Sequence, residues 1–103
     1  MGWANRAIQA LEAGELAQCR PHGGSMRGRI ESGQLVTLDP TPEPQIDDAV
    51  LCRCKGNVYI HLVKAIRGHG PKQRFLIGNN RGGLNGWVAR AAIYGVVVAV
   101  SDE

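Results

Sequence analysis

The chain has 103 residues, enough for one domain with a modest core and too few for a second folding unit beside it. Hydrophobic residues make up 44% of the chain and charged residues 20%, a composition that excludes an intrinsically disordered protein. The formal net charge of +3 is a mild excess, which by itself does not single out a nucleic-acid-binding protein.

The longest apolar run covers residues 93–100, far less than the roughly 20 residues that a membrane-spanning helix needs, so we expect no membrane segment. Residues 1–6 lack the charged and apolar regions of a secretion signal. Three cysteines, an odd number, are typical of a compartment in which thiols stay reduced. We therefore expect a cytoplasmic protein.

The first expected element is a short helix over residues 4–13, which Gly14 ends. Apolar residues at spacings of three and four would lie on one face of this helix: Trp3, Ala7, Ile8 and Leu11. We expect a helical segment, residues 1–14, and a β-rich domain, residues 15–103, that together form one folding unit.

From residue 15 onward, short apolar runs are interrupted by Gly, Pro and Asp, which is typical of a β-rich domain. Strands are expected, in chain order, at residues 34–38, 49–54, 58–66, 73–77 and 93–100. The second and third of these flank Lys55-Gly56-Asn57, a segment with hairpin chemistry, and should lie at the centre of the sheet. Residues 79–86, rich in Gly and Asn, are expected to form a loop. The sequence thus predicts a mainly β fold with one short N-terminal helix.

The segment Gly23-Gly24-Ser25-Met26 is the first candidate for chemistry. Two glycines before a serine let the backbone adopt conformations closed to other residues and let a substrate come near. The serine hydroxyl and the neighbouring N–H groups are then exposed together, as a nucleophilic serine requires. Because Gly-Gly-Ser alone is typical of flexible loops, its meaning depends on the motifs that follow.

Several short motifs follow this turn in a fixed order. They are Gly33-Gln34, Asp48-Ala49, His61-Leu62-Val63, Gly78-Asn79-Asn80 and Gly95-Val96-Val97. In content, order and spacing, residues 21–103 resemble the LexA and signal-peptidase superfamily of serine peptidases. That family has a Gly-x-Ser-Met turn, two strand starts, a Lys or His base on a strand, a Gly-Asp-Asn loop and a closing Gly-x-Val strand. The resemblance implies the family's complex β fold and a serine endopeptidase that acts on peptides or proteins.

The resemblance also implies a role for individual residues. Ser25 would be the nucleophile, and the backbone N–H groups near Gly24 and Ser25 would hold the oxyanion. Aligning residues 49–63 with the family's strand pair without gaps puts His61 at the position of the base, and an imidazole with a pKa near 6.5 suits that task. Lys64 is the alternative base, but on a regular strand it should point to the opposite face from His61. Residues 78–87, which are rich in Asn and Gly, could wall a peptide groove with Arg81 and Trp87 as anchors, or could form a tight turn with Trp87 packed in the core. The candidate residues that wall or support a groove are Met26, Asn79, Asn80, Arg81, Asn85 and Trp87.

The sequence departs from the family at acidic positions, where it has Gln34, Asn79 and Asn85. An asparagine can orient an imidazole but supplies no negative charge to stabilise imidazolium. These departures leave a second hypothesis open, in which the fold serves a non-catalytic interaction or inhibitory accessory module of the kind that phages and other mobile elements encode.

A third hypothesis is nucleic-acid binding through a basic face, which the mild charge excess disfavours. Cys52 and Cys54 share one face of a strand, but the second closely spaced pair of a typical zinc site is missing. We therefore expect no metal and no cofactor. The sequence does not determine the oligomeric state or a role for Cys19, Cys52 and Cys54.

Overall fold

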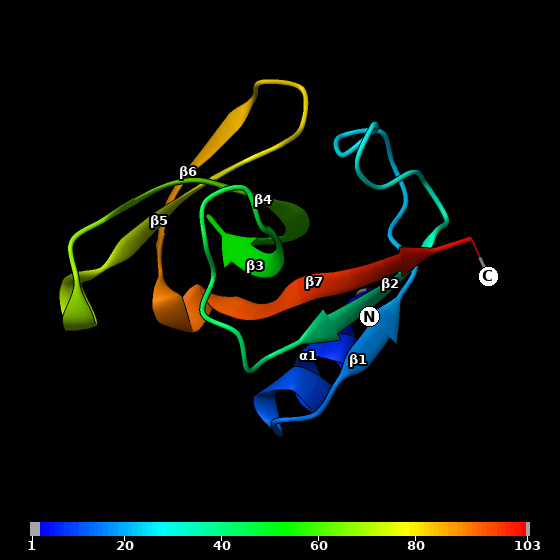
Figure 1. The fold of residues 1–103 in the computed structure, drawn as a ribbon, viewed down its shortest axis with the longest axis horizontal. Helices are drawn as coiled ribbons and strands as arrows, with labels where there is room; N and C mark the ends of the chain where they lie inside the picture. Colours follow the sequence, from blue (N-terminus) through cyan, green and yellow to red (C-terminus); the bar gives the residue numbers. More distant parts are fainter. Residues whose placement is uncertain (1–2, 103) are drawn as a thin grey trace.

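The chain folds into one antiparallel sheet and one α-helix in a computed structural model that describes residues 3–102 (Figure 1). The helix α1 spans Asn5–Glu12. The strands are β1 (Ala17–Cys19), β2 (Leu35–Asp39), β3 (Ala49–Cys54), β4 (Asn57–Arg67), β5 (Arg74–Gly78), β6 (Leu84–Ala89) and β7 (Ile93–Ser101). Short 3-10 turns, η1 (Gly70–Lys72) and η2 (Arg90–Ala92), precede β5 and β7. The predicted mainly β fold with one N-terminal helix is confirmed. Residues 1, 2 and 103 of the predicted ranges 1–14 and 15–103 lie outside the described residues.

The strands are ordered β1-β2-β7-β3-β4-β5-β6 across the sheet, which places the hairpin of β3 and β4 near its centre, as predicted. Figure 1 shows β5 and β6 to one side of this hairpin, while α1 lies against β1 and β7. Each of the five predicted strands agrees with an observed strand to within one residue at either end.

Two strands were not predicted. β6 begins inside residues 79–86, so the loop expected there is shorter and covers residues 79–83. Asn and Gly disfavour strands, but β6 is an edge strand with a bulge, which is where a sheet tolerates such residues. β1 has three residues, too few to show a periodic pattern.

The central strand β3 is buried on both faces, which explains its nearly unbroken apolar sequence. Leu51 packs with Leu11 of α1 and with Leu38 and Leu62 in one core cluster. The residues on the opposite face of β3 join a second cluster around Phe75 of β5. The sheet therefore separates two cores and fixes β3 and β4 between them.

The helix α1 buries Ala7 and Leu11 against the sheet. Trp3, expected on the same face, precedes the helix and remains 48% exposed. Among residues 3–102, no helix combines the length and the apolar character needed to cross a membrane.

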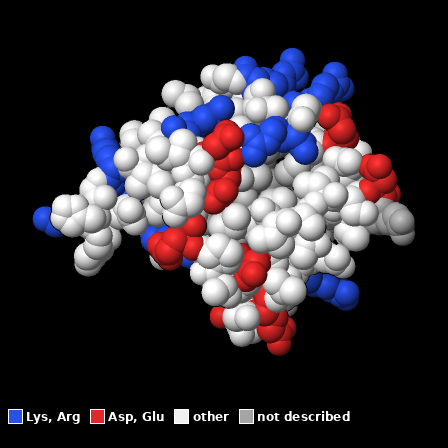
Figure 2. Space-filling view, viewed as in Figure 1, with Lys and Arg blue, Asp and Glu red and all other residues white. Residues whose placement is uncertain are grey.

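Positive and negative side chains are interspersed over the face seen in Figure 2. Lys and Arg gather along its upper edge, where Figure 1 draws the loop between β1 and β2 and the turn between β5 and β6. This face therefore carries no continuous basic stripe, but it has a local cationic edge.

Candidate active site

A serine, a histidine and an asparagine from three separate segments form a chain of hydrogen bonds. Oγ of Ser25, in the loop between β1 and β2, lies 3.1 Å from Nε2 of His61 on β4. Nδ1 of the same ring lies 2.9 Å from Oδ1 of Asn85 on β6. The fold thus places the two residues that the sequence suggested as nucleophile and base within hydrogen-bond distance, with Asn85 on the far side of the ring.

The surroundings of His61 favour a neutral imidazole. The side chain is buried, and this burial lowers its pKa below the ordinary value of 6.5, while the hydrogen bond with Asn85 opposes the shift. Since Oδ1 of Asn85 can only accept, Nδ1 of His61 donates to it. Nε2 then keeps a free lone pair, which accepts the hydroxyl proton of Ser25. Tyr59 stacks on the ring at 4.5 Å between centroids, which further fixes its orientation.

Asn85 reaches His61 because of a β-bulge. In the pairing of β5 with β6, Ile77 lies opposite Gly86 and the next residue, Gly78, lies opposite Leu84, so Asn85 has no partner in the ladder. Gly86 has a φ of +145°, a conformation that L side chains rarely adopt. A bulge of this kind redirects a side chain, and here it turns Asn85 toward the histidine.

The turn that carries Ser25 is held by its own backbone and by two buried side chains. The N–H of Arg27 donates to the carbonyl of Gly24, and the N–H of Ile30 donates to that of Met26. Met26 and Ile30 are buried in the core. The N–H groups of Gly24, Ser25 and Met26 donate a hydrogen bond to no protein group within residues 3–102. Unengaged N–H groups beside an exposed hydroxyl are what an oxyanion hole requires.

The turn between β5 and β6 clamps the Ser25 turn from outside. The backbone N–H of Asn80 donates to the carbonyl of Ser25 at 2.9 Å, and its side-chain amide donates to the carbonyl of Arg27 at 2.9 Å. Oδ1 of Asn79 accepts the N–H groups of Arg81 and Gly83, which closes the turn itself. The two asparagines therefore position the candidate nucleophile.

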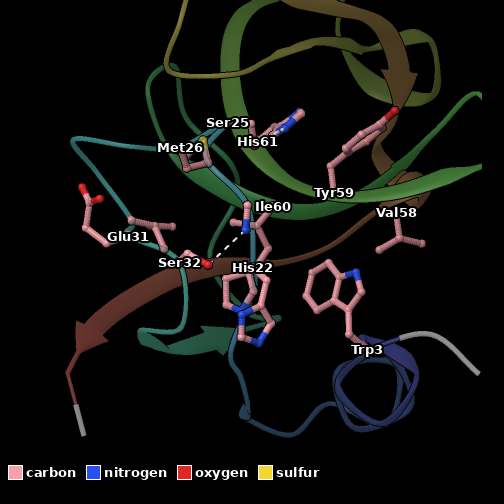
Figure 3. Close-up of a pocket in the computed structure, with 13 residues that line it drawn as sticks. Trp3, His22, Ser25, Met26, Glu31, Ser32, Val58, Tyr59, Ile60 and His61 are labelled. Carbon is pink, nitrogen blue, oxygen red and sulfur yellow. Dashed lines mark hydrogen bonds between the residues drawn. The ribbon is translucent and has the colours of Figure 1, made fainter.

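A pocket of about 120 Å³ opens beside Ser25 and His61. Figure 3 shows these two residues at one end of the pocket, with Trp3 and His22 at the other. The apolar lining comes from Trp3, Pro21, Met26, Ile30, Val58, Tyr59 and Ile60, while the polar lining includes His22, Glu31 and Ser32. An apolar cavity of about 150 Å³ can hold benzene, so this pocket has room for one aliphatic side chain.

Three residues that the sequence singled out lie away from this constellation. Lys64 is the unpaired residue of a bulge in β4, and no hydrogen bond joins it to Ser25 within the described chain. Trp87 lies under the guanidinium of Arg67, 4.3 Å from the ring centroid, and does not line the pocket. Gln34 bonds instead with Glu31 and Asp102.

Most residues that line the pocket were not predicted from the sequence, among them Tyr59 and Trp3. Tyr59 is two positions before His61 on the same strand, so the period of a strand could have indicated that both share a face. Trp3 reaches the pocket only because α1 packs on the sheet, and no local pattern in the sequence signals that contact.

The cysteines form a separate feature. All three are free, and Cys52 is fully buried, which together with the nearby Cys54 raises its pKa to about 12. Its thiol therefore stays protonated at neutral pH. In the part of the chain that the structure describes, no group of three or more His, Cys, Asp or Glu side chains is placed to hold a metal ion.

No protein-family model and no curated protein matches this sequence, so its function has to be inferred from the geometry around Ser25.

Proposed function

We propose that the chain is a small serine endopeptidase of the LexA/signal-peptidase-like superfamily, with Ser25 as the nucleophile and His61 as the general base. The observation that carries this proposal is the 3.1 Å contact between Oγ of Ser25 and Nε2 of a buried His61. A serine hydroxyl is activated when it is hydrogen-bonded to a base and a third group orients that base.

The reaction follows from these positions. Oγ of Ser25 attacks the carbonyl carbon of the substrate while its proton moves to Nε2 of His61. Backbone N–H groups at Gly24 and Ser25 hydrogen-bond the resulting oxyanion. His61 then gives the proton to the leaving amine, and the C–N bond breaks to leave an acyl ester on Ser25. A water molecule, deprotonated by His61, hydrolyses that ester and restores the free hydroxyl.

Asn85 takes the third position, where many serine hydrolases have a carboxylate. Its amide holds the ring orientation and the tautomer, as an asparagine does in the Cys-His-Asn arrangement of papain-like proteases. It adds no charge to stabilise imidazolium, so we expect slower turnover than a carboxylate would give.

The pocket, which is lined by both apolar and polar groups, would receive the side chain of the reacting residue of a peptide substrate. A carbonyl at Ser25 would place the neighbouring side chain between Met26, Ile60 and Tyr59. The volume of the pocket, about 120 Å³, favours valine or leucine over a large aromatic residue at this position of the substrate.

The proposal is tested with a fluorophosphonate probe, which phosphonylates only an activated serine. Wild type should be labelled at Ser25, and Ser25→Ala and His61→Ala should not. Ser101→Ala, which removes a serine from the end of β7 outside the pocket, is the matched control and should be labelled like wild type. A folded wild type that takes no label and cleaves no peptide would exclude the peptidase.

That negative result would favour the second candidate, a non-catalytic interaction module with the same fold. One observation supports it: within residues 3–102, no carboxylate hydrogen-bonds to His61. Such a module would use the pocket beside Ser25 to hold a partner's side chain without cleaving its backbone.

A further inference from the structure

An arginine lies beside the turn of the proposed nucleophile. A Cβ atom built on Gly24 would be 3.9 Å from Nη1 of Arg81, which places the guanidinium next to the residue before Ser25. Gly24 is also one of the residues whose N–H is unengaged within residues 3–102. The positive charge of Arg81 therefore lies beside one of the N–H groups proposed to hold the oxyanion.

The backbone that carries Arg81 is held in place. Its N–H donates to Oδ1 of Asn79 at 2.8 Å, and the N–H of Asn80 donates to the carbonyl of Ser25. The turn between β5 and β6 and the turn of the nucleophile are thereby fixed to each other. An arginine whose backbone is held in this way loses less conformational freedom on binding than one on a free loop.

The charge of Arg81 has no ion-pair partner among residues 3–102. The ion pairs of the described chain are Arg29 with Asp47 and Arg90 with Glu43, and neither involves Arg81. Arg27, which is exposed and forms no ion pair in the same range, is on the Ser25 turn itself. Arg27 is in the loop between β1 and β2, and Arg81 is in the turn between β5 and β6. Figure 1 draws these two segments at the upper edge of the molecule, where Lys and Arg gather in Figure 2. The proposed nucleophile therefore lies at an edge that carries Arg27 and Arg81, which form no ion pair within residues 3–102, together with one carboxylate, Glu31, which lines the pocket.

We propose that Arg81 binds an acidic side chain of the substrate, within two residues of the bond that is cleaved. This inference rests on the proposed function, and it makes acidic peptides the preferred substrate class. Successive residues of an extended peptide are about 3.4 Å apart, so a carboxylate one or two residues from the scissile carbonyl can reach the guanidinium. Arg27 adds to the local potential, and Arg81 makes the directed contact.

The test uses fluorescence-quenched peptide mixtures in which one position is fixed as Glu or as Gln and the others vary. Each position is scanned in turn. For wild type, we expect kcat/KM to be about fivefold higher with Glu at one position near the cleavage site, the size of effect expected for an exposed charge pair. This preference should fall as salt is raised from roughly 50 to roughly 500 mM, a range that spans weak and strong screening.

Variants of individual arginines show which side chain causes the preference for Glu over Gln. Arg81→Gln should abolish the preference for Glu, Arg81→Lys should retain part of it, and Arg81→Glu should reverse it, so that peptides with Gln are cleaved faster than peptides with Glu. Arg74→Gln is the matched control, because Arg74 is at the other end of β5 from the Asn79–Gly83 turn, and it should keep the preference of wild type.

The outcomes separate this inference from the proposed function. A wild type that takes the fluorophosphonate label but distinguishes Glu from Gln at no position overturns the inference and leaves the hydrolase standing. An Arg81→Gln variant with an intact preference overturns it as well. A folded wild type that takes no label and cleaves no peptide removes the proposed function and this inference together.

Discussion

Two features of the surroundings of His61 have opposite effects on its pKa. Its side chain is buried, which disfavours the charged ring, yet both ring nitrogens have hydrogen-bond partners. Burial lowers its pKa, and this outweighs the opposing effect of Asn85. The ring is therefore available as a neutral base at physiological pH.

The lowered pKa of His61 predicts how stability depends on pH. Between the pKa of the folded protein and the ordinary value of 6.5, the unfolded chain binds more protons at this residue, so the free energy of unfolding rises with pH there. We expect the contribution of His61 to be complete above pH 6.5 and to be lost as the pH falls below it. Urea unfolding at pH 7.5 and 5.5 measures it, with His61→Gln as the variant that lacks this titration. Equal pH dependence of the two proteins would contradict the prediction.

Asn85→Asp tests the third member of the constellation. A carboxylate 2.9 Å from Nδ1 would stabilise imidazolium, so we expect the pKa of His61 to rise by at least about one pH unit and turnover to increase. NMR titration of the imidazole ring reports the pKa whether or not the protein is active. Asn57→Asp, at the exposed start of β4, is the control and should leave His61 unchanged. An imidazole pKa that is the same in Asn85→Asp as in wild type would show that the side chain at this position does not contact the ring.

At the scale of elements, the hairpin of β5 and β6 performs two tasks. Its bulge aims Asn85 at His61, and its turn holds the carbonyl groups of Ser25 and Arg27 through Asn80. Gly78 allows the turn to close, since a Cβ there would lie 2.5 Å from the carbonyl oxygen of Gly83. Site geometry thus depends on a segment rich in Gly and Asn.

Asn80→Ala should loosen this clamp. The variant loses the side-chain bond to the carbonyl of Arg27, which we expect to lower the free energy of unfolding by about 1 kcal/mol. Fluorophosphonate labelling of Ser25 should also slow, because the turn that carries Ser25 is less well held. Asn57→Ala, an exposed substitution, should change stability by less than about 0.5 kcal/mol. Equal stability and equal labelling in the two variants would refute the clamp.

Part of this architecture could be predicted from the sequence. Ser25, His61 and the Gly78-Asn79-Asn80 loop were found from motif order, and β2, β3, β4, β5 and β7 from apolar runs. The contact of Asn85 with His61 could not be predicted, because it depends on a bulge in β6, and the composition of that segment indicates a loop. Trp3 in the pocket and the charge of Arg81 beside Gly24 follow from tertiary packing, which no local pattern encodes.

At the scale of the whole molecule, two cores on opposite faces of the sheet hold the site. Leu51, fully buried on β3, packs in the cluster that also contains Met26 of the Ser25 turn. The same strand contributes its other face to the cluster around Phe75. Stability and site geometry are therefore coupled through β3.

Leu51→Ala should be strongly destabilising. Removing a fully buried leucine leaves a cavity, and we expect the free energy of unfolding to fall by about 2–5 kcal/mol. Leu16→Ala is the matched control, because Leu16 is 62% exposed, and it should change stability by less than about 0.5 kcal/mol. Denaturant unfolding measures both. Similar effects of the two substitutions would contradict the core described for β3.

The claim that His61 activates Ser25 is tested most directly by the rate at which a fluorophosphonate modifies Ser25 as a function of pH. Intact-protein mass spectrometry follows the added mass, and fragmentation assigns the residue. We expect the rate to rise with the loss of one proton below pH 6.5, to level off above it, and to fall by at least about 100-fold in His61→Ala. A label on another residue, or a rate on Ser25 that is unchanged in His61→Ala, would contradict it.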